Sequence, residues 1–278
     1  MNVFFVCGAP KSGTTWLQRI LDAHPEICCS GEGHFIQRFT VPMAKAVNAY
    51  NQGLRIDAAQ VYEGRPYYPE VDQAEFDEMA RGFILRRLMA RAGPATGWVG
   101  DKTPAYTRHL GQLQRLFPQA KIIHIVRDPR EVAVSRIAHS HRAGAPDVLT
   151  PGAENYRITV EGAISQWTQA VTAVDAFASA HPGVVHEVRY RDLHADPFGE
   201  IEQMYDFLGA PAPRVIVEQV VAATSFEALA GRPAGQEDVN AFLRKGVPDD
   251  WRSRLDEESA EKIARSCGEL MREKRFAA

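Results

Sequence analysis

Short runs of apolar residues alternate along this chain with longer segments in which apolar residues recur every three or four positions. The short runs are rich in β-branched and aromatic residues and predict buried strands at 3–7, 26–29 and 120–127, a short strand and turn within 98–106, and a strand that runs into a turn within 184–193. The helical spacing predicts helices at 16–24, 72–91, 108–117, 159–180, 198–208 and 256–275. This alternation is typical of an α/β protein, so we expect a three-layer sandwich in which helices cover a mostly parallel central sheet.

Length and composition fit a single large domain. The chain has 278 residues, 45% of them hydrophobic and 24% charged, which is ordinary for a globular protein in water. Neither an internal repeat nor a clear linker interrupts the pattern, so we expect one domain spanning 1–278. The formal net charge is −3 at pH 7, which gives no global argument for binding nucleic acid or an anionic membrane surface.

Cysteine usage and the first residues lead to a prediction of the compartment. The four cysteines, at positions 7, 28, 29 and 267, show no Cys-x-x-Cys spacing, and this pattern favours a reducing compartment. The first predicted strand begins at Val3 with no basic leader before it, and its apolar run is too short for a signal or a membrane span. We therefore expect a cytoplasmic protein without an integral membrane segment.

A glycine-rich loop lies between the first predicted strand and the first predicted helix. Such a loop is typical of a phosphate site, because backbone N–H groups converge on the anion and the helix N-terminus adds the positive end of its dipole. Gly8 and Gly13 have the separation of nucleotide triphosphatase loops, but Thr14 stands where those loops carry lysine. The lysine is instead Lys11, inside the loop, where it can point at a group departing from the phosphate. Thr14 and Thr15 can add hydroxyl donors.

The loop as a whole resembles a known cofactor site. Its string Pro-Lys-Ser-Gly-Thr-Thr-Trp resembles the 5′-phosphosulfate loop of sulfotransferases that use 3′-phosphoadenosine 5′-phosphosulfate (PAPS). The resemblance implies a P-loop-like sulfotransferase fold and a set of cofactor-binding residues, namely Lys11, Ser12, Gly13, Thr14, Thr15 and Trp16. It also implies that Lys11 stabilises charge on the departing phosphate, and it makes Trp16 a candidate stacking face for adenine.

A carboxylate follows the second predicted strand. Gly31 and Gly33 flank Glu32, and a parallel second strand would bring Glu32 to the sheet edge that carries the phosphate loop. A carboxylate there can act as general base toward an acceptor hydroxyl or amine. The strings Leu-Asp-Ala-His-Pro and Gly-Glu resemble tyrosylprotein sulfotransferases, and Glu-x-His-Phe resembles heparan sulfotransferases. In both groups a glutamate at this place is the catalytic base, which implies that role for Glu32.

The string after the third predicted strand supports the same assignment. In the family that this chain resembles, the small-molecule sulfotransferases of the cytosol carry Lys-Thr-His at this place, and its histidine is catalytic. The string is instead Lys102-Thr103-Pro104, so that histidine is absent and the base assignment moves to Glu32. The candidates for the acceptor side are His34, Lys102 and Tyr106.

A second anion site is predicted where the fourth predicted strand meets the next helix. Arg127 leaves the end of the strand, and Ser135 lies two helical turns further on. The pair resembles the 3′-phosphate site of the family, and the planar fork of arginine suits bidentate bonds to phosphate oxygens. Resemblance to the family's adenine and 3′-phosphate segments adds further cofactor-binding candidates, namely Tyr190, Thr224, Phe226, Arg244, Lys245 and Gly246.

Two segments, 36–97 and 142–158, carry less readable patterns. Tyr62, Tyr67 and Tyr68 mark a loop with exposed aromatic residues. One interpretation is that 36–97 only covers the sheet, and the other is that it forms a lid over the acceptor. We expect 142–158 to be a loop that forms another wall of the acceptor pocket.

The resemblance implies transfer of a sulfuryl group from PAPS to a hydroxyl or amine, with release of 3′-phosphoadenosine 5′-phosphate (PAP). We expect a small-molecule, sugar or lipid acceptor and no nucleic-acid partner. We also expect no metal, because His139 and His141 have no further ligands at metal spacing. Two alternatives stay open: a small-molecule kinase on a similar fold, and a non-catalytic nucleotide-binding module. The sequence predicts neither the identity of the acceptor nor the oligomeric state.

Overall fold

The fold is built around a sheet of five parallel strands, seen in a computed structural model that describes residues 1–241 and 243–277. The strands are β1 (Asn2–Gly8), β2 (Ile27–Gly31), β3 (Trp98–Lys102), β4 (Lys121–Val126) and β5 (Val185–Arg189). Their spatial order is β2-β3-β1-β4-β5, with β1 in the centre. All five overlap the apolar runs that predicted strands, and the α/β class with a parallel sheet is confirmed.

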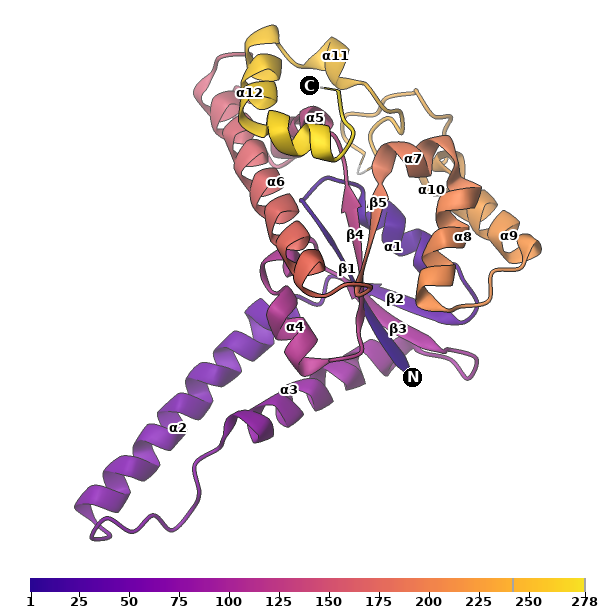
Figure 1. The fold of residues 1–278 in the computed structure, drawn as a ribbon. Helices are drawn as coiled ribbons and strands as arrows, with labels where there is room; N and C mark the ends of the chain where they lie inside the picture. The colour runs from indigo at the N-terminus through magenta and orange to yellow at the C-terminus, as the bar shows by residue number, and fades with distance from the viewer. Residues whose placement is uncertain (242, 278) are drawn as a thin grey trace.

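Helices cover both faces of the sheet, which gives the predicted three layers (Figure 1). Side chains of β1 point alternately to the two faces. Phe4 and Val6 share one core with α1 (Thr14–Asp22), α8 (Pro197–Leu208) and α9 (Arg214–Thr224). Phe5 and Cys7 share the other with α3 (Gln73–Leu88), α4 (Leu110–Leu116) and α6 (Glu154–Ala180).

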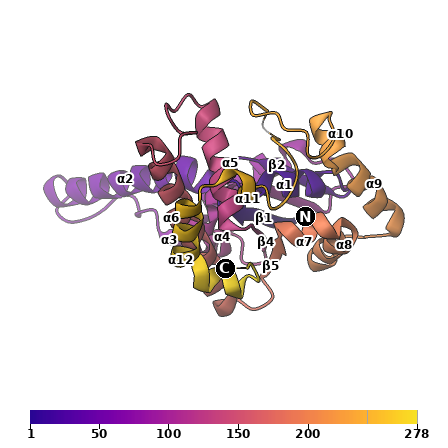
Figure 2. The ribbon, with the colours of Figure 1, turned by 90° about the horizontal axis from the view of Figure 1, so that it is seen from above.

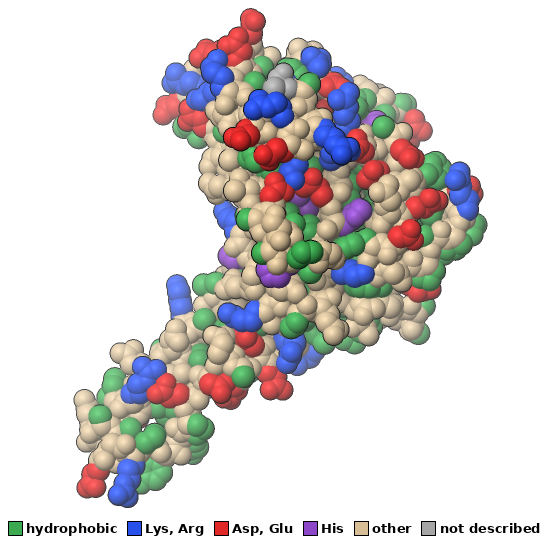
Figure 3. Space-filling view, in the orientation of Figure 1, with side chains coloured by type: hydrophobic (Ala, Val, Ile, Leu, Met, Phe, Trp, Pro, Cys, Tyr) green, Lys and Arg blue, Asp and Glu red, His purple; other side chains and the backbone are tan. Residues whose placement is uncertain are grey.

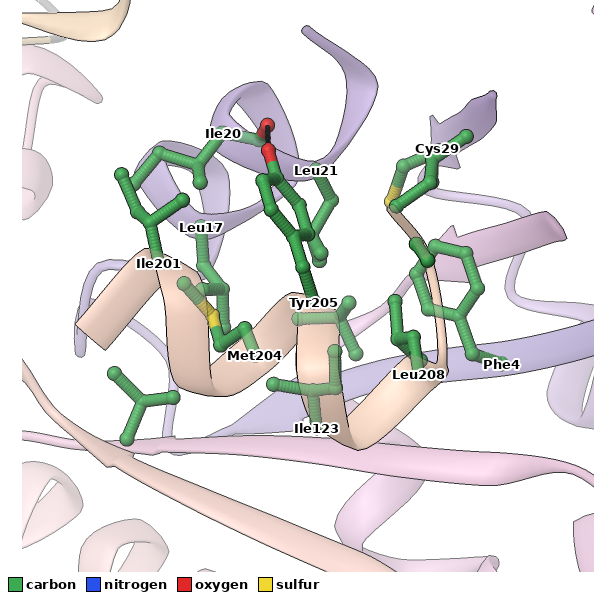
Figure 4. Packing of buried hydrophobic residues seen from close by; sticks show 14 of the residues in the cluster. Phe4, Leu17, Ile20, Leu21, Cys29, Ile123, Ile201, Met204, Tyr205 and Leu208 are labelled. Carbon is green, nitrogen blue, oxygen red and sulfur yellow. Dashed lines mark hydrogen bonds between the residues drawn. The ribbon is translucent and has the colours of Figure 1, made fainter. Parts of the chain in front are cut away.

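The first of these cores links distant parts of the chain. Residues of α1 and α8 interdigitate above the sheet, and the Tyr205 hydroxyl donates a hydrogen bond to the Ile20 carbonyl at 3.0 Å (Figure 4). A third core lies between α5 (Pro129–Arg142), α6 and α12 (Glu257–Glu273). The remaining helices are short: α7 (Tyr190–Ala195), α10 (Phe226–Ala230), α11 (Trp251–Arg254), and the single turns Ile36–Thr40, Met89–Arg91 and Pro104–Arg108.

An arm projects from this body. It begins with α2 (Val41–Gln60), which extends away from the sheet in two perpendicular views (Figures 1 and 2), and α3 returns to the body. The space-filling view shows the arm standing apart, with hydrophobic and charged side chains mixed on its surface (Figure 3). Tyr62, Tyr67 and Tyr68 are exposed in the loop at its end. Since Ala80 and Ile84 of α3 pack against the sheet, part of 36–97 does cover the core.

Two helical boundaries differ from the prediction. The helix expected at 159–180 begins at Glu154, so the predicted loop 142–158 is shorter than expected. The helix α2 was not predicted, because only Asn51 and Ala58 of its 20 residues are buried and no apolar stripe marks it. None of the described helices is long and apolar enough to cross a membrane.

Candidate functional site

The carboxyl ends of four strands bring predicted site residues together. Lys11 follows β1, Glu32 follows β2, Arg127 follows β4 and Tyr190 follows β5. Because the strands are parallel, these ends meet at one edge of the sheet. A cavity of about 770 Å³ opens there, and all four residues line it. The full set of predicted residues in its walls is Lys11, Gly13, Thr14, Thr15, Trp16, Glu32, His34, Arg127, Ser135, Tyr190, Thr224, Phe226, Arg244, Lys245 and Gly246.

The loop after β1 has the geometry of an anion cradle. Gly13 adopts φ +102° at the start of α1, and a Cβ there would come within 2.7 Å of the Tyr190 ring. Lys11 adopts φ +76°, an uncommon backbone conformation for a residue with a side chain. Burial lowers the pKa of Lys11 below its usual 10.5, and the nearby Arg142 adds to that effect. Ser12 does not reach the cavity walls, because its side chain is fully buried.

Two basic side chains hold the Glu32 carboxylate. The Lys102 ammonium lies 2.6 Å from Oε1, and His34 Nε2 lies 3.1 Å from Oε2. The sheet register explains the first contact, because Gly31 of β2 pairs with Lys102 of β3. The Lys102 side chain is only 6% exposed and does not line the cavity. The structure therefore directs Lys102 at Glu32 and not into the cavity, so of its two expected roles, contact with the acceptor or an ion pair, it shows the ion pair.

A buried aspartate supports the loop that carries Glu32. Asp101 Oδ1 accepts a hydrogen bond from the Gly33 amide at 2.9 Å, and Oδ2 accepts one from the Thr103 hydroxyl at 2.7 Å. Burial raises the pKa of Asp101 above 3.8, although these hydrogen bonds act in the opposite direction. Sequence reasoning missed this residue. In the structure it is an acidic side chain within a strand whose five residues are all buried.

Tyr106 lies elsewhere than expected. Its side chain is fully buried and packs edge-on against Phe5 of β1. Its hydroxyl donates to Asp101 Oδ2 of β3 at 2.8 Å. It lines no part of the cavity. Tyr106 therefore belongs to the core and to the support of the Asp101 carboxylate, which corrects its placement on the acceptor side.

Arg127 and Ser135 line the same cavity, as predicted. Arg127 Nε donates to Glu131 Oε2 at 2.6 Å, and the guanidinium carbon lies 4.1 Å from the centre of the Tyr190 ring. The sequence did not indicate Glu131, which also accepts a hydrogen bond from the Asp249 amide at 2.5 Å. The guanidinium is thus fixed by a carboxylate on one side and an aromatic face on another.

The predicted basic segment near the C-terminus folds over the cavity. Arg244 and Lys245 both form ion pairs with Asp250, and the Lys245 contact measures 2.5 Å. Gly246 adopts φ +68°, and a Cβ there would meet the Phe226 ring at 2.1 Å. The segment is therefore packed directly on the Phe226 side of the cavity.

Aromatic residues form a separate wall. Trp16 lies edge-on to Tyr190, with ring centres 5.6 Å apart, and its indole N–H donates to the Thr224 carbonyl at 2.9 Å. Trp16, Tyr190, Thr224 and Phe226 all line the cavity. This wall offers flat apolar surface beside the anion cradle, which suits a purine base.

Helices α5 and α6 supply cavity residues that sequence reasoning missed. They are Arg136, His139, Ser140, Arg142 and Gln166. No residue of 36–97 or 143–158 lines the cavity, so the described structure supports neither a lid from the first segment nor a wall from most of the second. Within 1–241 and 243–277, no three His, Cys, Asp or Glu side chains gather at metal-binding distance.

Comparison with known proteins assigns the chain to a class. The sulfotransferase family model matches residues 4–214. The chain belongs to this family. It is 26% identical over 211 residues to protein-tyrosine sulfotransferase 1 of Danio rerio, which covers 76% of this chain and 54% of that protein. It is also 26% identical over 303 aligned positions to cytosolic sulfotransferase 17 of Arabidopsis thaliana, covering 98% of this chain and 74% of that protein. The chain thus spans about half the length of the tyrosine sulfotransferase.

A solved structure extends the likeness to the fold. A mouse sulfotransferase complexed with PAP matches with a TM-score of 0.57 and 18% identity, over 98% of this chain and 85% of that one. This similarity confirms the predicted sulfotransferase-type α/β fold.

Proposed function

We propose that this chain, as a single domain, transfers a sulfuryl group from PAPS to a hydroxyl or amine. The observation that carries the proposal is one cavity that joins the Lys11 cradle, the Glu32 carboxylate and the Arg127–Ser135 pair. Membership of the sulfotransferase family and the PAP complex of the mouse structure support it. A small-molecule, sugar or lipid acceptor and a cytoplasmic location remain part of the proposal.

The chain's residues have complementary tasks in this reaction. PAPS supplies the activated sulfuryl group. Lys11, Gly13, Thr14 and Thr15 bind its 5′-phosphate. Arg127, Ser135 and the segment 244–246 bind its 3′-phosphate, and Trp16, Tyr190, Thr224 and Phe226 bind the adenine. Such binding positions the reacting atoms, which is a large part of catalysis for this kind of transfer.

Proton transfer and charge stabilisation complete the proposal. Glu32 takes the proton of the acceptor as the new oxygen–sulfur or nitrogen–sulfur bond forms. Lys11 stabilises the negative charge left on the 5′-phosphate as its bond to sulfur breaks. Lys102 and His34 orient Glu32, since they contact its two oxygens. Protein cations supply the positive charge, so we propose no metal.

Calorimetric titration with PAP, beside ATP with magnesium, tests the proposed cofactor. We expect saturable binding of PAP without metal and far weaker binding of ATP. Tight binding of magnesium ATP alone would favour the small-molecule kinase. Binding of PAP with no transfer of labelled sulfate to any hydroxyl or amine compound would favour a non-catalytic nucleotide-binding module.

A further inference from the structure

The cavity carries more positive charge than the proposed cofactor sites use. Six Lys and Arg side chains line it, whereas Glu32 is the single carboxylate among the described wall residues. The six are Lys11, Arg127, Arg136, Arg142, Arg244 and Lys245. The whole chain has a formal net charge of −3, so this concentration of positive charge is local to the cavity.

These cations differ in their partners. Arg127 is paired with Glu131, and both Arg244 and Lys245 are paired with Asp250. Arg136 and Arg142 instead contact neutral groups. Nη1 of Arg136 donates to Gln166 Oε1 at 2.6 Å, and Nη1 of Arg142 donates to the Val239 carbonyl at 3.4 Å. Within 1–241 and 243–277, neither of these two arginines forms an ion pair with a carboxylate.

Arg136, His139 and Arg142 follow the proposed 3′-phosphate residue Ser135 along α5. His139 and Arg142 follow Ser135 by four and seven residues, so they lie on one helical face at increasing distance from Arg127. Arg136, His139 and Arg142 nevertheless share the cavity with Glu32 and Lys11. Arg136 and Arg142 therefore line the same cavity as Glu32 without being among the proposed cofactor contacts.

The electrostatic coupling agrees with this placement. Burial lowers the pKa of His139 below 6.5, and Lys11, Arg142 and Arg136 lower it further. Lys11 in turn has its pKa lowered by burial, by Arg142 and by Arg136, while Glu32 opposes the shift. Like charges held this close repel one another, and a bound anion would relieve that repulsion.

We propose that the acceptor carries an anionic group, a carboxylate or a phosphate monoester, which Arg142 and Arg136 bind while its hydroxyl or amine faces Glu32. This inference rests on the proposed function and names the acceptor class. The arginine fork suits both kinds of anion. A neutral analogue would leave both guanidinium groups without an opposite charge, so the site discriminates against it.

Matched pairs of compounds test the charge preference. The pairs are 4-hydroxyphenylacetate and its amide, glucuronate and its amide, and glucose 6-phosphate and glucose. Each is titrated calorimetrically into PAP-saturated protein and then offered as acceptor with labelled PAPS. In at least one pair we expect the acid to bind about tenfold or more tightly than its neutral partner, a difference of one decade in the dissociation constant. No such preference in any pair would overturn the inference.

Variants of Arg142 test whether this residue causes the preference for charged acceptors. Arg142→Gln should reduce the ratio within the pair to near one, whereas Arg142→Lys should keep part of it because the charge remains. Arg157→Gln removes the same charge from an exposed position of α6 outside the cavity and serves as the control. A ratio unchanged in Arg142→Gln would overturn the inference, and so would an equal loss of PAP affinity, since Arg142 would then be a cofactor residue.

The two proposals fail in different ways. If the unaltered protein does not bind PAP, the proposed function itself is wrong. If it binds PAP but prefers neutral compounds, only the anionic acceptor is wrong.

Discussion

The Glu32 carboxylate and the Lys102 ammonium meet at the carboxyl ends of two neighbouring strands. The carboxylate follows β2, and Lys102 ends β3 at the paired position of the sheet. The glutamate side chain is still 38% exposed, so an acceptor can approach it from the cavity. The residue therefore combines a fixed orientation with access, which a general base requires.

The variant Glu32→Gln tests the base directly. It keeps the size of the side chain but cannot take a proton. We expect the rate of transfer from labelled PAPS to fall by roughly 10²–10⁴-fold, the usual contribution of a general base. The PAP dissociation constant from calorimetry should change by less than about twofold, because the carboxylate is not among the proposed cofactor contacts. An undiminished rate would exclude Glu32 as the base.

Arg127 provides a second test at the residue scale. Arg127→Lys keeps the charge beside Glu131 but removes the planar fork. We expect PAP to bind roughly tenfold or more weakly, as for a lost hydrogen bond to a charged group. AMP, which lacks the 3′-phosphate, should lose much less.

A matched arginine controls this experiment. Arg130 lies three residues after Arg127, in the first turn of α5, and pairs with Asp128, but it does not line the cavity. Arg130→Lys should leave the ratio of PAP to AMP affinity unchanged. If AMP and PAP lose equal affinity in Arg127→Lys, the arginine does not bind the 3′-phosphate.

Asp101 predicts a pH dependence of stability. Because burial raises its folded-state pKa above 3.8, the folded protein binds this proton more tightly than the unfolded chain. Its contribution to stability is therefore present at low pH and is lost as pH rises from 3.8 through the raised folded-state pKa. Asp101→Asn cannot ionise and still offers an oxygen to the Gly33 amide.

Denaturant unfolding at a series of pH values measures this effect. The free energy of unfolding of the unaltered protein should fall relative to that of Asp101→Asn as pH rises through that window. A constant difference between the two proteins would show that the carboxyl does not titrate differently in the folded state.

At the scale of elements, the sequence predicted the strands better than the contacts between them. The run at 121–126 is apolar and β-branched, so its strand was readable. The projecting helix α2 was not, because a helix that buries Asn51 and Ala58 alone has no apolar stripe. The ion pair of Glu32 and Lys102 joins residues 70 positions apart, and it depends on β2 and β3 being neighbours, which periodicity does not reveal.

The candidate site divides in the same way. The loop at 11–16 and Arg127 were recognisable because local strings specify them. Arg136 and Arg142 belong to a helix that is buried along much of its length, so its sequence indicates a core helix and not a binding site. Only the position of α5 beside the cavity gives these arginines a functional meaning.

The segment around Gly246 gives a prediction at this scale. Gly246→Ala places a Cβ within 2.1 Å of the Phe226 ring, so the segment with Arg244 and Lys245 must move. We expect PAP affinity to fall roughly tenfold, because the proposed charge-assisted contacts of Arg244 and Lys245 to the 3′-phosphate would be displaced. The thermal midpoint should fall only slightly, because the segment lies outside the three cores.

Gly235 offers the matched control for this variant. It also has a positive φ, +91°, but a Cβ there has no neighbour within 4 Å. Gly235→Ala thus introduces backbone strain without the clash. Similar losses of PAP affinity in both variants would mean that strain alone, and not contact with Phe226, accounts for the effect.

At the scale of the whole molecule, late segments of the chain pack on early ones. The Trp16 indole donates to Thr224, 208 positions away, and the Tyr205 hydroxyl donates to Ile20, 185 positions away. The Asp249 amide donates to Glu131 across 118 positions. The proposed cofactor site is therefore complete only when the C-terminal helices are docked on the loop that follows β1.

This interdependence predicts one cooperative unfolding transition for the body of the protein. The four tryptophans all lie outside the arm, so their fluorescence reports the body, whereas circular dichroism also reports α2 and α3. We expect a single fluorescence transition. PAP at 100 times its dissociation constant should stabilise the folded state by about 2.7 kcal/mol and raise the midpoint by several degrees. Two separate fluorescence transitions, with only one shifted by PAP, would contradict the single domain. They would mean that the C-terminal segments cover the proposed site but fold independently of it.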